Sequence, residues 1–443
     1  MRAALIAVAA LAIRAQTPPD PTDVLANARD RMVERAKRLP NYTCVQTVDR
    51  EYFVRSTPTP PYASCDQMSA AAHKKPYSLK VDATDRLRLD VKVSGGEEIG
   101  SWAGANRFDP RSIVEMAGGP FGSGQFGPLV LDVFVNIGTA FQYVGPDSQN
   151  NSAAFHYTFQ VPVVASHLMI RDAGRGSWIA TSYDGDLWID PASFDLRRFS
   201  VRTSELSQET GACQARMVAD YARVRFDSGD FLVPRQSTLH FIMRDTEETE
   251  VASRYSSCRE YRGQSTLSFT EVAAGSAAPS NTAPAQKPLP AGRRLVLAFT
   301  SAIDTDIAAA GDVIMAKVLK PVRDNRSKET LIPAGATVEG RIIVMKHWLA
   351  APAFHIAIML EALDIEGVSS PLYVRLDRTN EFTSERRSSA GLLQRGATII
   401  LPPMGQSASV GSFVFRTDKS RYVVPANYES NWLTISPPVR AEH

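Results

Sequence analysis

The sequence has almost no excess charge of either sign. It contains 49 Lys and Arg residues against 47 Asp and Glu, a net charge of +2 over 443 residues. A chain with so little net charge has no overall electrostatic field that would attract nucleic acid or anionic membranes, so we expect no nucleic-acid partner. After residue 15 the chain also lacks an apolar run near the ~20 residues that a membrane-spanning helix needs. With 44% hydrophobic and 22% charged residues, the composition is that of a globular protein.

Residue patterns for metal binding and catalysis are missing as well. There are four Cys and seven His, with no C-x-x-C pair and no histidine at a zinc-finger offset. The sequence contains no G-x-S-x-G motif of a serine nucleophile. Residues 122–127 match G-x-G-x-x-G, but Gly118-Gly119-Pro120 precedes them instead of a buried strand, and Pro128 follows. We therefore predict a loop that enters a helix, and we assign no catalytic residue, cofactor or metal.

The N-terminus predicts export. Arg2 is followed by an apolar run from Ala3 to Ile13, with small residues near its end. A positive start, a short apolar core and a small-residue exit are typical of a cleaved signal peptide, which we place at residues 1–15. We expect the mature protein in the periplasm or outside the cell.

The cysteines fit that compartment, because an even number of them in an exported chain indicates disulfides. They are Cys44, Cys65, Cys213 and Cys258. Four cysteines allow three pairings, and four free buried thiols are a further alternative. Pairing of sequence neighbours, Cys44 with Cys65 and Cys213 with Cys258, closes the shorter loops, so we favour it.

Composition divides the chain into two β-rich domains. Residues 272–290 are mostly small residues and prolines with Lys287 as their single charge, which is typical of a flexible linker. This stretch separates a first domain over residues 22–271 from a second over residues 291–443. Short strand-like runs with regular turns predict a small β-barrel or sandwich for the second domain.

Periodicity in the first domain predicts mostly strands and two helices. Apolar residues three and four apart predict a helix over 22–39, which Pro40 ends, with an arginine-rich face in water. Over 86–93, Leu and Val alternate strictly with charged residues, which predicts a strand with one buried and one wet face. Residues 128–141 are almost entirely apolar, so a helix there must bury most of its surface.

This second helix defines the candidate binding site. If the sheet is open, we expect the helix over 128–141 to lie across its mouth with Phe134, Ile137 and Phe141 pointing inward. Ordinary core packed on the sheet is the favoured interpretation of this helix, and a plug in a hydrophobic groove is the functional alternative. The residues of the candidate apolar groove are Leu87, Leu89, Val91, Phe134, Ile137 and Phe141.

Short motifs in the first domain resemble a known fold. Residues 183–191 read Y-x-G-x-L-W-I-D-P and lead to L-R-R-F at 196–199; LPNYTC at 39–44 follows the first helix, and LVPR at 232–235 opens a late strand. Over residues 22–271 these motifs resemble the lipoprotein-carrier (LolA-like) fold. The resemblance implies an antiparallel sheet curved into a half-barrel, lined by apolar side chains and closed by helices. Some members of the family hold lipid or acyl chains there. The insertion at 54–77 departs from the carrier itself.

The second domain carries a different resemblance. Residues 310–316 read AGDVIMA and residues 331–340 read LIPAGATVEG. Over residues 291–365 this is similar to the C-terminal β-barrel of channel proteins of type IV secretion and conjugation (TrbI-like), in which both turns link strands. The inner-membrane helix and the proline-rich stalk of that family are absent, so a channel role does not follow.

Three classes of function remain. We favour a non-enzymatic exported cell-envelope protein that binds an apolar ligand, such as a lipid or acyl chain, or a protein partner. The alternative is an envelope scaffold that acts through its C-terminal barrel, and an enzyme without a recognisable motif is least favoured. A deep groove under the helix over 128–141 would favour the first class. A sealed core with an exposed strand edge or apolar patch would favour the second.

Overall fold

The described chain is mainly antiparallel β-sheet with a few helices, as the sequence predicts. The computed structural model describes residues 19–55, 65, 67, 79–94, 97–105, 118–147, 153–170, 177–244, 247–261, 289–377 and 409–437. Strand pairing joins the part before residue 262 and the part after residue 288 into one 18-stranded sheet. The expected linker lies almost wholly outside the described residues, so the division into two domains stays a prediction.

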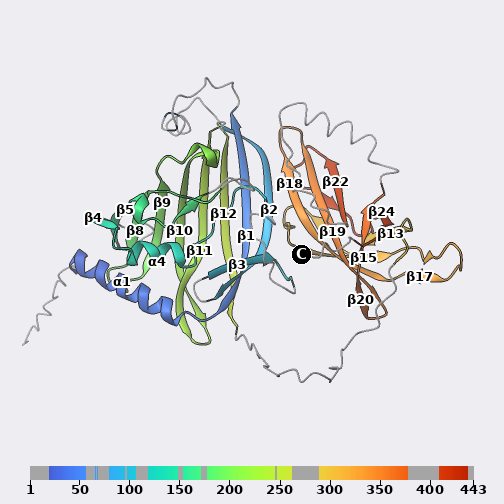
Figure 1. Ribbon diagram of the computed structural model, residues 1–443, viewed down its shortest axis with the longest axis horizontal. Helices are drawn as coiled ribbons and strands as arrows, with labels where there is room; N and C mark the ends of the chain where they lie inside the picture. The colour runs from blue at the N-terminus through green and yellow to red at the C-terminus, as the bar shows by residue number, and fades with distance from the viewer. Residues whose placement is uncertain are drawn as a thin grey trace, which may run out of the picture.

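The first part is an open antiparallel half-barrel (Figure 1). Its helices are α1 (Pro21–Arg38) and α4 (Pro128–Val135). Its strands are β1 (Tyr42–Arg55), β2 (Leu79–Ser94), β3 (Glu97–Trp102), β4 (Ala140–Asp147), β5 (Ala154–Val161), β8 (Tyr183–Ile189), β9 (Leu196–Thr203), β10 (Ala212–Phe226), β11 (Gly229–Met243) and β12 (Glu248–Glu260). They pair in the order β4–β5–β8–β9–β10–β11–β12–β1–β2–β3. A small ribbon, β6 (Met169–Ile170) with β7 (Ile179–Ala180), follows the 3-10 turn η2 (Val163–Ala165).

Both helices cover the apolar face of this sheet. Val24 and Ala28 of α1 and Val130, Val133 and Phe134 of α4 belong to one buried cluster with side chains from β1, β2, β3, β5, β8, β9, β10, β11 and β12. Strict alternation over 86–93 places Leu87 and Leu89 in that cluster, which confirms the predicted buried face of β2. The main core of the first part therefore lies between the sheet and the two helices.

The arginine-rich face of α1 is mostly exposed, as predicted, but two of its arginines contact the half-barrel. Arg31 donates to the carbonyl of Ser193, and its guanidinium lies 4.9 Å from the centre of the Phe194 ring. Arg35 forms an ion pair of 2.6 Å with Asp195. The turn between β8 and β9 thus fixes α1 against the half-barrel. At its start, the carboxylate of Asp20 accepts the N–H of Thr22, so Asp20 caps the helix.

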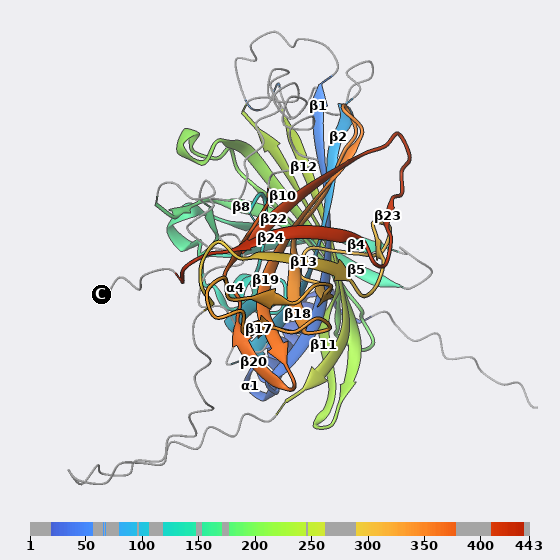
Figure 2. The same cartoon turned by 90° about the vertical axis from the view of Figure 1, so that its right-hand side faces the viewer.

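The second part forms a small barrel. Its strands are β13 (Arg294–Phe299), β14 (Ile303–Asp304), β15 (Val313–Val318), β16 (Val322–Arg323), β17 (Thr330–Ile332), β18 (Thr337–Trp348), β19 (Ala353–Ile365), β20 (Val368–Pro371), β21 (Val374–Leu376), β22 (Val410–Arg416), β23 (Val423–Val424) and β24 (Glu429–Thr434). Seven pair in the order β22–β19–β18–β15–β13–β24–β21. The Ser409 hydroxyl joins the two ends, because it accepts the N–H of Val374 and donates to the carbonyl of Leu372. Figure 2 shows β13 and β24 crossing the direction of β1 and β2.

The two parts meet at one edge of the half-barrel. Residues 346–348 of β18 pair antiparallel with residues 83–85 of β2. Next to this pairing, Ala310 exchanges two backbone hydrogen bonds with β2: its N–H donates to the carbonyl of Arg86, and its carbonyl accepts the N–H of Arg88. Arg341, only 3% exposed, donates to the carbonyls of Ala103 and Gly311 at 2.6 Å each.

The polar face of β2 binds the second part. Arg86 donates to the carbonyl of Asp306, and Arg88 forms an ion pair with Asp312. The sequence predicts a wet face here, and this prediction is wrong for these two arginines. The alternating pattern identifies which face is polar, but it carries no information about whether water or another protein segment covers that face.

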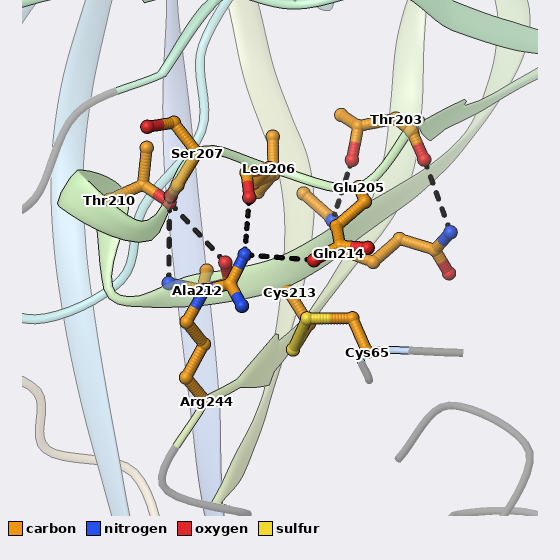
Figure 3. Close-up of a disulfide and its surroundings, with 11 residues drawn as sticks. Cys65, Thr203, Glu205, Leu206, Ser207, Thr210, Ala212, Cys213, Gln214 and Arg244 are labelled. Carbon is orange, nitrogen blue, oxygen red and sulfur yellow. Dashed lines mark hydrogen bonds and ion pairs between the residues drawn. A yellow bond between two sulfur atoms is a disulfide. The ribbon is translucent and has the colours of Figure 1, made fainter. Parts of the chain in front are cut away.

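All four cysteines form disulfides, but the predicted pairing is wrong. Cys44 is joined to Cys258 and Cys65 to Cys213. β1 and β12 are neighbouring strands, so Cys44 faces the end of β12 although the chain separation is 214 residues. Figure 3 shows the second bridge beneath the turn before β10, where Arg244 donates to the carbonyl of Leu206.

The junction allows a test with two glycine substitutions. Gly311 has a φ of +109°, and a Cβ on it would lie 2.0 Å from the carbonyl oxygen of Arg88. Gly335 has a φ of +88° with open space around it. We expect Gly335→Ala to cost about 1–2 kcal/mol for backbone strain alone, and Gly311→Ala about 1–3 kcal/mol more for the added clash. Urea denaturation of both variants measures this difference, and equal losses would contradict the described junction.

Candidate functional site

A row of aromatic rings lines the half-barrel under α4. Phe134 of α4 stacks on Phe141 of β4 with 6.3 Å between ring centres, and Phe141 is 6.4 Å from Phe159 of β5. Phe159 stacks in turn on Phe199 of β9 at 5.7 Å. The Phe159 ring lies directly over Gly185, where a Cβ would be 2.7 Å from it. Because glycine has no side chain at this position of β8, the Phe159 ring can pack directly against the strand.

The helix over this row is shorter than predicted. α4 ends at Val135 after eight residues, and Phe141 belongs to β4 instead of the helix. Asn136 ends the helix, because it leaves the helical conformation with ψ at 122° while its side chain donates to the carbonyl of Ala165 and accepts the N–H of Gly138. An asparagine that bonds its own backbone in this way competes with helix continuation.

The structure brings together some of the predicted groove residues. Leu87, Leu89 and Phe134 lie in the cluster under the helices, each at most 3% exposed, and Phe141 packs against it. Val91 lies further along the same face of β2, in a second cluster around Tyr42. The other groove residue, Ile137, is fully exposed, so the prediction that it points inward is wrong. It follows the end of α4, and its direction is set by the turn at Asn136.

A glycine-rich loop, residues 118–127, leads into α4 across the sheet. The carboxylate of Glu98 accepts the N–H groups of Gly124 and Phe126, both at 2.9 Å. These are backbone donors of the G-x-G-x-x-G match, and a carboxylate of the protein itself occupies them. The loop therefore positions α4, and its amides at these positions are already bound.

Further contacts hold the loop along its length. Arg50, only 3% exposed, donates to the carbonyl of Gly118 and forms an ion pair of 2.7 Å with Asp85. The Tyr221 hydroxyl donates to the carbonyl of Gln125 at 2.8 Å. The Phe126 ring lies edge-on to Tyr255 with 4.7 Å between ring centres. The loop is thus fastened by residues from β1, β3, β10 and β12.

α4 itself has one polar anchor on its length. Asp132 lies 2.7 Å from the Nδ1 atom of His167, and the Tyr183 hydroxyl donates to its other oxygen at 3.4 Å. The remaining residues of α4 are apolar. Its N-terminus has no side-chain cap within the described residues, since Gly127 precedes Pro128. An eight-residue helix is too short to be stable in water alone, so α4 depends on the aromatic row beneath it.

The arrangement offers apolar burial rather than polar chemistry. In the described ranges, no group of three or more His, Cys, Asp or Glu side chains could hold a metal ion. The space under α4 is filled by side chains with exposures near zero, including Val130, Val133 and Phe134. An apolar molecule could enter there only if α4 moved.

The residues that hold this cover cannot be found from the sequence pattern. Glu98 and Tyr221 lie on strands far from the loop in sequence, so no spacing connects them to it. The repeated glycines at 118, 119, 122, 124 and 127 are the one signal in the sequence that points to the loop. Asp132 is visible as a break in the apolar run, but its partners are not.

No protein-family model and no curated protein sequence matches this chain. Among solved structures, an outer-membrane lipoprotein-sorting protein domain from Vibrio parahaemolyticus shares 11% identity at a TM-score of 0.24, over 54% of this chain and 92% of that one. A LolA-superfamily protein from Nitrosomonas europaea shares 8% identity at a TM-score of 0.22, over 53% and 94%. Lipoprotein LppX from Mycobacterium tuberculosis shares 12% at 0.20, over 55% and 99%.

The compartment is indicated by the chain's own chemistry. Two disulfides are typical of an oxidising environment such as the periplasm or the cell exterior. Across the ranges that the structure describes, no helix is both long and apolar enough to pass through a membrane. The predicted signal peptide, residues 1–15, lies outside the described residues and stays a prediction.

The Glu98 contact predicts a pH dependence. Burial raises the pKa of Glu98 above its ordinary value of 4.5, against the lowering effect of the two N–H donors. Between 4.5 and the raised pKa the folded protein therefore holds more protons than the unfolded chain, so this carboxyl makes the fold less stable as pH rises. Glu98→Gln removes this dependence. We expect the stability of the wild type relative to Glu98→Gln to increase when the pH falls from about 7 to about 5.

Urea denaturation at both pH values measures that change. The neighbouring Glu97 is exposed, so Glu97→Gln is the matched control and should track the wild type. If the wild type and Glu98→Gln show the same pH dependence, the carboxylate is not held as the structure describes.

Proposed function

We propose that this chain is a non-enzymatic exported envelope protein that binds an apolar ligand between its half-barrel and α4. The ligand class that fits a row of stacked rings with no charge among them is a lipid or a single acyl chain. One observation supports this most: α4 is a two-turn helix without a side-chain cap in the described chain, and it covers the aromatic row through apolar side chains. An acyl chain offers the sheet the same kind of contact that Phe134 now makes.

The core under α4 is sealed in the described structure, which by itself favours the envelope-scaffold alternative. The carrier function therefore requires that this closed core is the unliganded state. α4 is linked to the sheet by a loop with positive φ at Gly118, Gly119, Gly124 and Gly127, where glycine adopts conformations that other residues rarely do. Displacing α4 breaks the contacts of Val130, Val133 and Phe134 and exposes the rings. A ligand that restores this burial offsets the free energy of opening. Its apparent affinity is reduced by the fraction of molecules that are open.

Phe134→Ala tests this proposal. In a sealed core, removing a buried Phe costs about 3–5 kcal/mol. If α4 is a movable cover, the variant can adopt the open state instead of keeping a cavity. The loss in the free energy of unfolding is then no larger than the free energy of local opening. We expect a loss below about 2 kcal/mol, together with at least about tenfold tighter binding of a fluorescent fatty acid, since the cost of opening is reduced. Urea midpoints and fluorescence titration measure the two effects.

Phe413→Ala is the matched control. Phe413 is a buried aromatic residue of the barrel core, 6% exposed and far from α4 in the fold. Its loss should cost the full about 3–5 kcal/mol and leave fatty-acid binding unchanged. If Phe134→Ala costs as much as Phe413→Ala and neither the wild type nor the variant binds fatty acid, the carrier function is contradicted. The envelope-scaffold alternative would then be favoured.

A further inference from the structure

Four aliphatic side chains project into water at the end of α4. They form the apolar tip, which consists of Val135, Ile137, Val163 and Val164. Ile137 is 100% exposed and Val164 is 93% exposed, while Val163 and Val135 are 51% and 41% exposed. Single exposed aliphatic residues are ordinary on protein surfaces. Four of them on adjoining segments form an exposed apolar patch, and such patches often mark interaction sites.

The two turns of the apolar tip are held together by hydrogen bonds and packing. The side chain of Asn136 donates to the carbonyl of Ala165 and accepts the N–H of Gly138. A Cβ on Gly138 would lie 2.5 Å from the Cβ of Ala165, so the turn after α4 packs closely on η2. The exposure of Ile137 and Val164 is therefore set by a defined local structure.

The form of the apolar tip favours a lipid surface over a protein partner. It consists of a turn and a 3-10 turn, which provide no strand edge for pairing. The nearby edge strand β4 resists strand addition, because it has a bulge between Tyr143 and Gly145 and contains Pro146. Protein interfaces obtain most of their affinity from Trp, Tyr and Arg in packed pockets, and none of the four tip residues is of these types. A bilayer instead accepts projecting aliphatic side chains without a matching shape.

We propose that the apolar tip docks the half-barrel on a lipid surface by inserting Ile137 and Val164 among the acyl chains. This inference rests on the proposed function, since it places the C-terminal end of α4 at the surface from which an acyl chain enters. Ile137 follows the last residue of α4 by two positions, so the docked tip and the cover belong to one segment. The four tip side chains are uncharged, and docking therefore does not require anionic lipid.

Vesicle flotation with the full mature chain tests the inference. The probes are vesicles of phosphatidylcholine alone and of phosphatidylcholine with phosphatidylglycerol, at low and high salt. We expect the wild type to float equally with both, and the double variant Ile137→Asn, Val164→Asn to lose at least about tenfold in partitioning. The matched control is Ile307→Asn, Val313→Asn, which removes exposed aliphatic residues of the second part, 68% and 44% exposed, and should float like the wild type.

Several results would overturn the inference. One is a wild type that floats with neither kind of vesicle, and another is a wild type that floats only with anionic vesicles at low salt. A third is an equal loss of partitioning in the tip variant and the control variant. A wild-type dimer in sedimentation that the tip variant abolishes would show that a second copy covers the tip.

Fatty-acid titration without vesicles separates this inference from the proposed function. A tip variant that binds fatty acid like the wild type but does not float supports both. A wild type that floats but binds no fatty acid retains the docking surface and contradicts the carrier function.

Discussion

The structure depends on covering the concave face of an open sheet. A half-barrel leaves one face of its strands apolar and unpaired with a second sheet, so other elements must bury that face. α1 does so as a long helix fixed by Arg31 and Arg35 to the turn after β8. α4 does so as a short helix whose position depends on the glycine-rich loop and on Glu98. α1 is a helix of 18 residues and α4 is a helix of eight residues, and this difference in length is the basis of the proposed binding site.

The second constraint is the fate of the sheet edges. Unpaired strand edges are a liability in an exported protein, because they pair with other chains. β18 and the segment around Ala310 pair with the stretch of β2 that β3 leaves unpaired, so the barrel covers this part of the half-barrel edge. At the other side, β4 pairs with β5 alone in the described chain and protects itself by a bulge and a proline. The second part thus covers an edge of the first part that would otherwise be unpaired.

Local patterns predicted much of the fold. Alternation over 86–93 identified a strand and its buried face, and the apolar periodicity with Pro40 identified α1. The resemblance over residues 22–271 implied the open half-barrel, and turn spacing over residues 291–443 predicted a small barrel or sandwich. Each of these properties is set by residues close in sequence, so the sequence displays them directly.

Long-range properties were not predictable in this way. The pairing of Cys44 with Cys258 follows from β1 and β12 being neighbours, while loop length, which was the argument for the wrong pairing, changes the closure cost only slowly. The end of α4 depends on Asn136 reaching Ala165, and the position of the loop depends on Glu98 from β3. In both cases, the partner lies on an element that the apolar pattern cannot connect to the site.

Hydrogen exchange of α4 with and without a fatty acid tests the central claim most directly. A movable cover opens without global unfolding, so amides of α4 should exchange with a lower protection free energy than those of β8 and β9. Addition of palmitate should change exchange in that segment while leaving the barrel strands β18 and β19 unchanged. Protection of α4 equal to that of β8 and β9, with no response to palmitate, would show that α4 is permanent core and would contradict the account.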